Sequence, residues 1–264
     1  MLGKLFKYEM KSTARTFLPF FAAILGLSVV NKISMMFFAN FDFMNIPKFV
    51  LMTTYILMIA AAFVMCIIVT IQRFYKNLLG SEGYLMFTLP VSTTANILSK
   101  AITAFIWIIA TSLVTLLSIF VMIPDYDWMK DIPSAWGQVA AEFQRAFGIS
   151  LNLMFWLFCA VIAFSIILFI FEVYFAVSIG QLSNNHKLLA SFGAYVGLYM
   201  VGQIISMAVI SIIGLNTFNV IAPTGNGMHM MLGILIASLA EEIVLAAVYF
   251  LLSRFLLGKK LNLE

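Results

Sequence analysis

Hydrophobic residues dominate the sequence in six long runs, which are separated by shorter segments rich in polar and charged residues. The runs cover residues 16–38, 47–71, 95–123, 147–179, 188–213 and 228–257. Each run exceeds the roughly 20 apolar residues that a helix needs to cross a bilayer. The pattern therefore predicts six membrane-spanning helices, and the extra length predicts that several are tilted or extend beyond the membrane.

The first 15 residues follow a different pattern, in which basic residues recur at a spacing of three or four. The basic positions are Lys4, Lys7, Lys11 and Arg15. This spacing places them on one face of a helix, and apolar residues occupy the other sides. Such a helix is suited to an anionic membrane surface. We expect an amphipathic interfacial helix over 1–15, which also anchors the topology through its positive charge.

The composition supports a membrane protein. The 264 residues are 63% hydrophobic and 10% charged, with a mean hydropathy of +1.07. A typical soluble domain is about 45–50% apolar and about 25% charged, so an ordinary soluble globule is excluded. Intrinsic disorder is excluded too, because disordered chains combine low hydrophobicity with high charge. We expect an all-α polytopic fold that forms a single transmembrane domain over 1–264.

The distribution of basic residues predicts the orientation, because Lys and Arg gather on the cytoplasmic side of membrane proteins. With both termini in the cytoplasm, 11 of the 15 basic residues are cytoplasmic and four are external. We therefore expect a multi-pass protein of the cell membrane with both ends inside, a cytoplasmic loop over 72–94 and an external segment over 124–146. A short surface helix is expected within it, over 138–147. The net charge of +4 reflects this topology, so we expect no nucleic-acid partner.

Three acidic residues lie inside the apolar runs, namely Glu172, Glu241 and Glu242. Acids inside a membrane are costly and usually have a partner or a function. Adjacent helical positions point about 100° apart, so Glu241 and Glu242 cannot both face one partner. Structural hydrogen bonding inside the bundle and a gating or substrate-facing role both remain open for this pair. For Glu172, a structural ion pair and a position in an inner vestibule remain open.

The fifth run contains Gly193 and Gly197, which are four residues apart. Small residues at this spacing allow two membrane helices to approach closely. Packing within the subunit is the favoured interpretation, and a seam between two subunits is the alternative.

Sequence signatures of catalysis are absent. A phosphate-binding loop requires Ser or Thr after its Gly-Lys pair, but Lys260 follows that pair here. The histidines His186 and His229 are not one helical turn apart, and the cysteines Cys66 and Cys159 show no metal-ligand spacing. We expect a chain that is not an enzyme and holds no metal or cofactor of its own.

The loop 72–94 carries the most specific motif. Its residues, with the lysine that follows, are Glu82, Gly83, Tyr84, Leu85, Thr88, Leu89, Pro90, Ser92 and Lys100. This stretch resembles the first cytoplasmic loop of bacterial ABC-2-type transporter permeases. There an acidic residue, a glycine, Tyr-Leu and Thr-Leu-Pro precede a Ser or Thr and a Lys that opens the next helix. The resemblance covers the whole chain in layout and 73–100 in motif.

The residues of this loop also predict a short helix on physical grounds. Ser81 can cap it, and Glu82 is favourable in its first turn. Pro90 ends it, because the residue before a proline avoids helical geometry. Apolar side chains at Tyr84 and Leu85 offer a soluble partner a rigid surface to grip. A re-entrant loop or an interfacial anchor is the alternative.

The resemblance implies a permease subunit of an ATP-driven exporter, most often found in Gram-positive bacteria. Two permease subunits, identical or related, would each dock one ATPase subunit through a coupling helix. The coupling residues would be Glu82, Gly83, Tyr84, Leu85, Leu89 and Pro90. The N-terminal helix would be a second contact, and ATP and Mg would bind the ATPase. Family members mostly export peptides, antimicrobial agents or lipid-like molecules.

Two other classes remain as alternatives. One is a stand-alone secondary carrier. The other is an immunity factor that binds an antimicrobial peptide, because acidic external residues could attract a cationic peptide. These external acids are Asp125, Asp127, Asp131 and Glu142.

Overall fold

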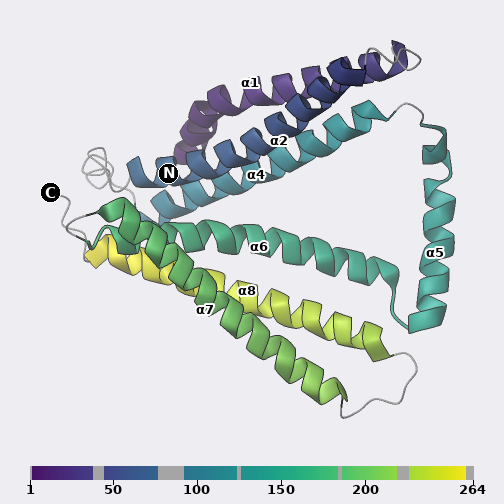
Figure 1. Ribbon diagram of the computed structural model, residues 1–264. Helices are drawn as coiled ribbons and strands as arrows, with labels where there is room; N and C mark the ends of the chain where they lie inside the picture. Colours follow the sequence, from purple (N-terminus) through teal and green to yellow (C-terminus); the bar gives the residue numbers. More distant parts are fainter. Residues whose placement is uncertain are drawn as a thin grey trace. The chain divides into compact units, whose positions relative to one another are not determined.

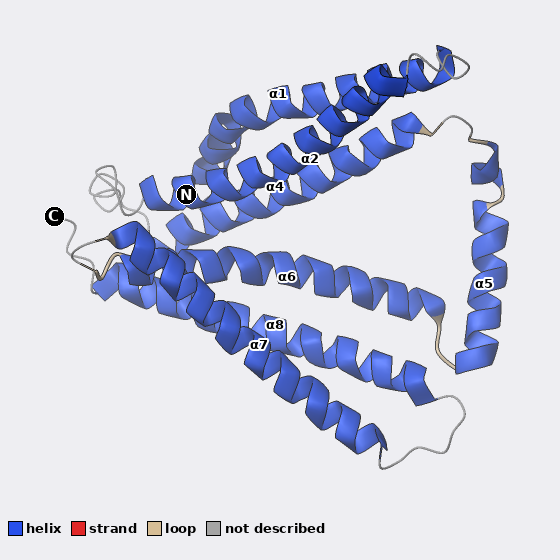
Figure 2. Cartoon of the chain, in the orientation of Figure 1, coloured by secondary structure: helices blue, strands red, loops and turns tan. Residues whose placement is uncertain are grey.

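The computed structural model describes residues 2–37, 45–76, 92–123, 126–183, 186–218 and 226–259. Within these ranges the chain forms seven α-helices, one short 3-10 helix and no strand (Figures 1 and 2). The elements are α1 (Leu2–Phe37), α2 (Asn45–Phe74), α4 (Thr93–Met122), η3 (Asp127–Lys130), α5 (Ile132–Phe147), α6 (Leu151–Gly180), α7 (Lys187–Phe218) and α8 (Asn226–Lys259).

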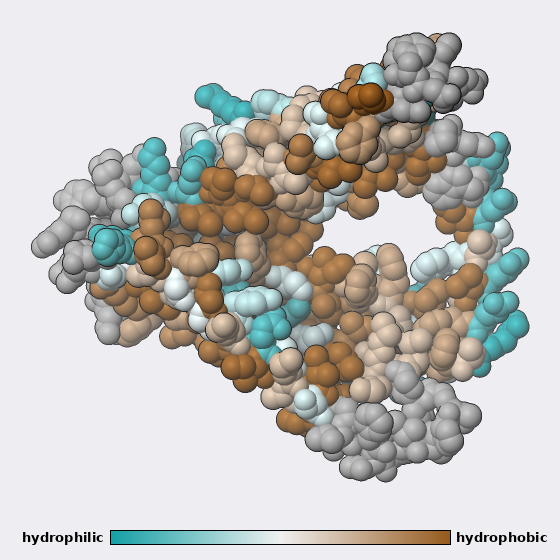
Figure 3. All heavy atoms as spheres, viewed as in Figure 1, coloured by the Kyte–Doolittle hydropathy of each residue, from teal (hydrophilic) through white to brown (hydrophobic). Residues whose placement is uncertain are grey.

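Six of these helices are long and apolar enough to cross a membrane, namely α1, α2, α4, α6, α7 and α8. Each of the six predicted apolar runs corresponds to one of them. The prediction of an all-α polytopic fold is therefore confirmed, and the chain is a multi-pass membrane protein. Apolar residues cover most of the helical surface in Figure 3, as expected of helices that face lipid.

The contacts between helices divide the chain into two compact units, Met1–Trp128 and Met129–Glu264, here called unit 1 and unit 2. In unit 1, α1 packs against α2 and α4, which also contact each other. In unit 2, α6 packs against α7 and α8, and α5 contacts α6 and α8. Each unit thus contains three long helices, and the first and third form the most extensive pair.

Helix α1 joins the predicted interfacial helix and the first span in one element. The basic side chains of its first turns, Lys4, Lys7, Lys11 and Arg15, are all exposed, as expected. The helix bends near its N-terminal end (Figure 1), and Pro19 lies inside it. A proline in a helix interior removes a backbone hydrogen bond and clashes with the preceding turn, which kinks the helix. The expected boundary near residue 15 is therefore a bend within one helix.

Aromatic packing holds the core of unit 1 together. Phe17 and Phe21 of α1 pack with Trp107 of α4 and Cys66 of α2. The rings of Phe17 and Trp107 are stacked, with centroids 4.6 Å apart and planes 13° apart. Stacked aromatic pairs contribute beyond the area that they bury, so this contact fixes α1 against α4.

Helix α5 confirms that the segment after α4 contains a short helix, although it begins six residues earlier than expected, and its external position stays a prediction. A proline occupies its first turn and Gly148 ends it in the left-handed conformation, with φ of 69°, which favours glycine. Trp136 donates a hydrogen bond to Asn152 Oδ1 at 3.1 Å and meets Phe155 edge to face. Hydrophilic residues line α5 in Figure 3. This amphipathic helix suits a position at a membrane surface.

The turn between α6 and α7 is closely packed at Gly180. A Cβ atom added there would lie 2.6 Å from the backbone nitrogen of Ser191, which leaves no room for a side chain. By contrast, a Cβ added at Gly193 or Gly197 would meet no atom of the described chain within 4 Å. The described residues of unit 2 therefore do not pack closely against these two glycines, and packing within the subunit stays a prediction. A seam between subunits stays a prediction.

Candidate functional site

The predicted coupling residues Glu82, Gly83, Tyr84, Leu85, Leu89 and Pro90 lie outside the described residues. The structure does describe the two helices that carry this loop. Helix α2 ends at Phe74, and α4 begins at Thr93. Ser92 caps α4, because its side-chain oxygen accepts a hydrogen bond from the backbone nitrogen of Ala95 at 3.3 Å. The matching Ser92 of the motif is thus a helix cap.

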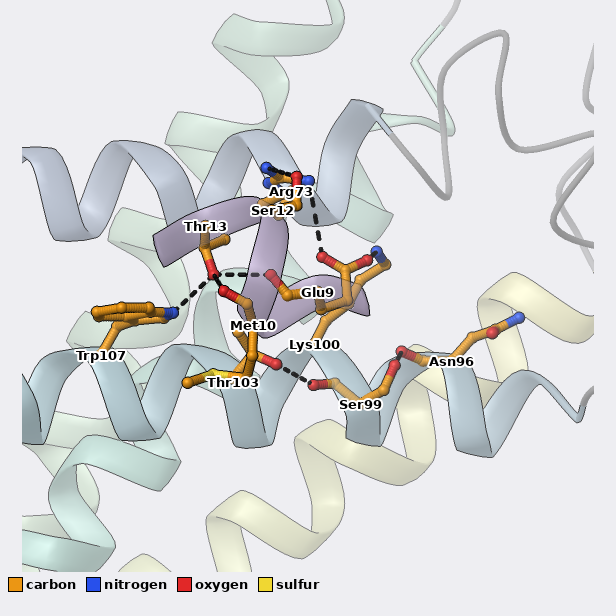
Figure 4. Close-up of polar contacts among 10 residues, drawn as sticks. All are labelled: Glu9, Met10, Ser12, Thr13, Arg73, Asn96, Ser99, Lys100, Thr103 and Trp107. Atoms are coloured by element: carbon orange, nitrogen blue, oxygen red, sulfur yellow. Dashed lines mark hydrogen bonds and ion pairs between the residues drawn. The ribbon is translucent and has the colours of Figure 1, made fainter. Parts of the chain in front are cut away.

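A buried ion cluster joins the three helices of unit 1 at the end from which this loop leaves (Figure 4). Lys100 of α4 lies 2.5 Å from Glu9 Oε1 of α1. Arg73 of α2 lies 3.8 Å from Glu9 Oε2 and donates a hydrogen bond to Ser12 Oγ at 2.6 Å. Glu9 is 8% exposed and Lys100 is 3% exposed. One carboxylate therefore binds a cation from each helix that flanks the loop.

A hydrogen bond one turn away reinforces this cluster. Trp107 donates to the hydroxyl of Thr13 at 2.7 Å, and that hydroxyl donates to the backbone oxygen of Glu9 at 2.8 Å. Figure 4 shows the first turns of α1 crossing α2 and α4 at this point. Positions 96, 100, 103 and 107 of α4 are all buried, and their spacing places them on one helical face. An ion pair and a hydrogen bond thus fix the same two helices against each other.

Sequence reasoning missed Glu9, counted Arg73 and Lys100 only among the cytoplasmic basic residues, and assigned Lys100 to the loop motif. A signal was nevertheless present. Glu9 is the only acidic residue among the first 41, and it lies two positions from both Lys7 and Lys11, which places it opposite the basic face. An acid opposite a basic face points toward the protein, where it requires a buried partner.

The three acids of the apolar runs converge on one cavity of unit 2. This cavity has a volume of about 200 Å³ and lies between α6, α7 and α8. Glu172 of α6 lines it together with Glu241 and Glu242 of α8. No Lys, Arg or His is among its described lining residues. A hydrophilic patch surrounded by apolar surface is visible over α7 and α8 in Figure 3.

Two serine hydroxyls donate hydrogen bonds to two of these three carboxyl groups. Ser206 of α7 donates to Glu241 Oε1 at 2.6 Å, and Ser165 of α6 donates to Glu242 Oε1 at 2.5 Å. The two adjacent acids thus bond to different helices, as their angular separation requires. Both still reach one cavity, because it lies between those helices.

Other carboxylate oxygens at the cavity have no hydrogen-bond partner among the described residues. Glu242 Oε2 is buried without a hydrogen-bond partner among the described residues. Glu172 is 8% exposed, and no hydrogen bond or ion pair joins it to another described residue. The structural ion pair considered for Glu172 is therefore not found in the described chain, whereas its position beside a cavity matches the vestibule alternative.

The described part of the chain contains no group of three His, Cys, Asp or Glu residues arranged to hold a metal ion. Comparison with family models, curated proteins and solved structures finds no match. A functional assignment therefore depends on the Glu9 ion cluster of unit 1, the acidic cavity of unit 2 and the sequence of the loop between α2 and α4.

Proposed function

We propose that this chain is the permease subunit of a bacterial ATP-driven exporter of the ABC-2 type. The six long helices and the loop motif at 73–100 support the proposal. The observation that carries it is the Glu9 cluster. It ties α1 to both helices from which the predicted coupling loop extends.

In this mechanism the ATPase binds the loop at residues 82–90 and displaces it when ATP binds to the ATPase. The shift reaches the end of α2 and the start of α4, which carry Arg73 and Lys100. Because Glu9 binds both cations, α1 follows the movement. The aromatic contact between Phe17 and Trp107 then transmits it toward the middle of the span.

The proposed assembly contains two such permease subunits and two ATPase subunits, which bind ATP and Mg. It lies in the cell membrane with both termini of this chain in the cytoplasm. The exposed basic face at Lys4, Lys7, Lys11 and Arg15 would contact anionic lipid or the ATPase. The proposed substrates are peptides, antimicrobial agents or lipid-like molecules.

The test is to co-express and purify the chain with the ATPase subunit that the proposal requires, and to substitute two apolar loop residues. Tyr84→Ala with Leu85→Ala is expected to reduce co-purification and ATP turnover by at least about tenfold, the effect of losing about 1.4 kcal/mol of binding free energy. The control is Ile132→Ala with Val139→Ala, which removes two exposed apolar residues of α5 and leaves assembly unchanged. Wild-type assembly of the loop variant would overturn the proposal.

A stand-alone secondary carrier is the second candidate, and the acidic cavity of unit 2 favours it. Ionisable groups inside spans are typical of ion and substrate pathways in carriers. Reconstitution of the chain alone in liposomes separates the two functions. A carrier would move its substrate down an ion gradient without any ATPase, whereas a permease subunit would not.

A further inference from the structure

We infer that the cavity between α6, α7 and α8 binds a small organic cation that carries N–H donors, such as a primary ammonium group on a short alkyl chain. This inference concerns binding by the chain itself. It does not depend on the ATPase, because a permease and a carrier could both use such a site.

The first argument is the charge balance of the cavity. Three carboxyl groups line it, and its described lining includes no basic residue. Ser206 and Ser165 each satisfy one oxygen of Glu241 and Glu242. A buried carboxylate without a partner is costly, and a bound cation removes that cost. Unit 1 shows the alternative, since its buried Glu9 is neutralised by two basic side chains.

The second argument is that acceptors without a partner remain at the cavity. Glu172 is more than nine-tenths buried and lines the cavity without a hydrogen bond or ion pair to any described residue. Glu242 Oε2 is also buried without a partner in the described chain. A primary ammonium group has three donors and no acceptor, so its chemistry complements acceptors of this kind.

The third argument concerns the class of cation. The described carboxylates are not arranged as a metal-binding group. Instead, the aromatic side chains of Tyr199 and Tyr249 line the cavity with Leu168 and Leu245. Aromatic rings attract cations, and leucines accommodate an alkyl chain. Tyr249 is stacked on Phe175, with centroids 5.7 Å apart, so its ring is held in place.

The fourth argument is size. Pockets for drug-sized ligands have volumes of about 300–1,000 Å³, and this cavity, at about 200 Å³, is smaller. It suits a ligand of a few carbon atoms or the charged end of a longer molecule. For a peptide or lipid-like substrate, that end would be a basic side chain or an amino headgroup.

The experiment uses n-butylammonium as the probe and the purified full chain in lipid nanodiscs, with binding followed by calorimetry. We expect saturable binding that Glu172→Gln weakens at least about tenfold, because charge-assisted hydrogen bonds are the strong ones. Glu142→Gln, an exposed residue of α5, is the matched control and leaves the affinity unchanged. n-Butanol, which has the same alkyl chain without the charge, is expected not to bind.

A second variant guards against misfolding. Gln203 lines the same cavity from α7, and Gln203→Ala is expected to weaken binding less than Glu172→Gln while the chain stays monodisperse. Absence of saturable n-butylammonium binding would overturn the inference, as would equal binding of n-butanol or full affinity in Glu172→Gln. If n-butylammonium does not bind, the carboxyl groups would have to be neutralised by protons and not by a bound cation. None of them would affect the docking test at Tyr84 and Leu85.

Discussion

The acids of the two units lie in opposite settings. In unit 1 a single carboxylate, Glu9, meets cations from two neighbouring helices. In unit 2 three carboxyl groups line one cavity with no described basic residue beside them. Removing one partner of a buried ion pair is strongly destabilising, whereas an acid without a cation inside a span is a candidate functional group. The comparison separates a unit whose buried acid is paired with two cations from a unit whose acids line a cavity.

The largest effect is expected for Glu9→Gln. This change removes the carboxylate that faces the buried Lys100, and breaking a buried ion pair from one side costs about 3–5 kcal/mol. The free energy of unfolding, measured by denaturant titration in detergent micelles, is expected to fall by that amount. Combining it with Lys100→Met should restore part of the loss, because both charges are then removed. An unchanged stability would mean that the cluster does not hold unit 1 together.

A smaller loss is expected for Gly180→Ala in unit 2. The added methyl group would meet the backbone of Ser191, and overpacking of this kind costs about 1–3 kcal/mol. Gly193→Ala is the matched control, since a Cβ there meets nothing within 4 Å in the described chain. Thermal unfolding of both variants compares them directly. If the two behave alike, unit 2 is not held by close packing at this turn.

Trp107→Phe tests the hydrogen bond that supports the ion cluster of unit 1. The substitution keeps a ring for the stack on Phe17 but removes the donor to Thr13, so we expect a loss of about 1 kcal/mol. Trp156→Phe, at an exposed position of α6, should leave the unfolding free energy unchanged. A loss of similar size in both variants would assign the effect to the indole ring itself.

The smallest effect is expected for Glu172→Gln, the same chemical change as Glu9→Gln placed in the other unit. Because Glu172 has no cation beside it in the described chain, the free energy of unfolding should stay constant or rise. The same micelle titration measures it. A loss as large as that of Glu9→Gln would reveal an internal partner and would remove the contrast between the units.

Sequence alone predicted the parts of this fold that depend on local pattern. The six spans follow from hydropathy, and the later part of α5 was expected as a short helix over 138–147. The three acids of unit 2 were identified one by one, because a charge inside an apolar run is conspicuous. Their convergence was not predicted, since it depends on how α6, α7 and α8 are rotated about their axes.

The same limit explains what was missed in unit 1. Lys100 lies near the start of an apolar run and resembles a topology signal, yet it is buried because Glu9, 91 residues away along the chain, lies beside it. The glycines Gly193 and Gly197 have the spacing of a packing motif, but within unit 2 a Cβ added at either would meet no described atom within 4 Å. The burial and packing of such residues depend on partners that are distant in the sequence, and a local sequence pattern carries no information about those partners.

Pro19 has a consequence for the way α1 responds to force. A proline has no backbone N–H, so the carbonyl oxygen of Arg15 lacks its helical donor, and the helix is least stiff at that point. This point separates the turns that carry Glu9 from most of the span. In the proposed coupling mechanism, a pull on Glu9 would therefore rotate the short N-terminal part of α1 about Pro19, and the longer part in the bilayer would tilt without sliding along its axis.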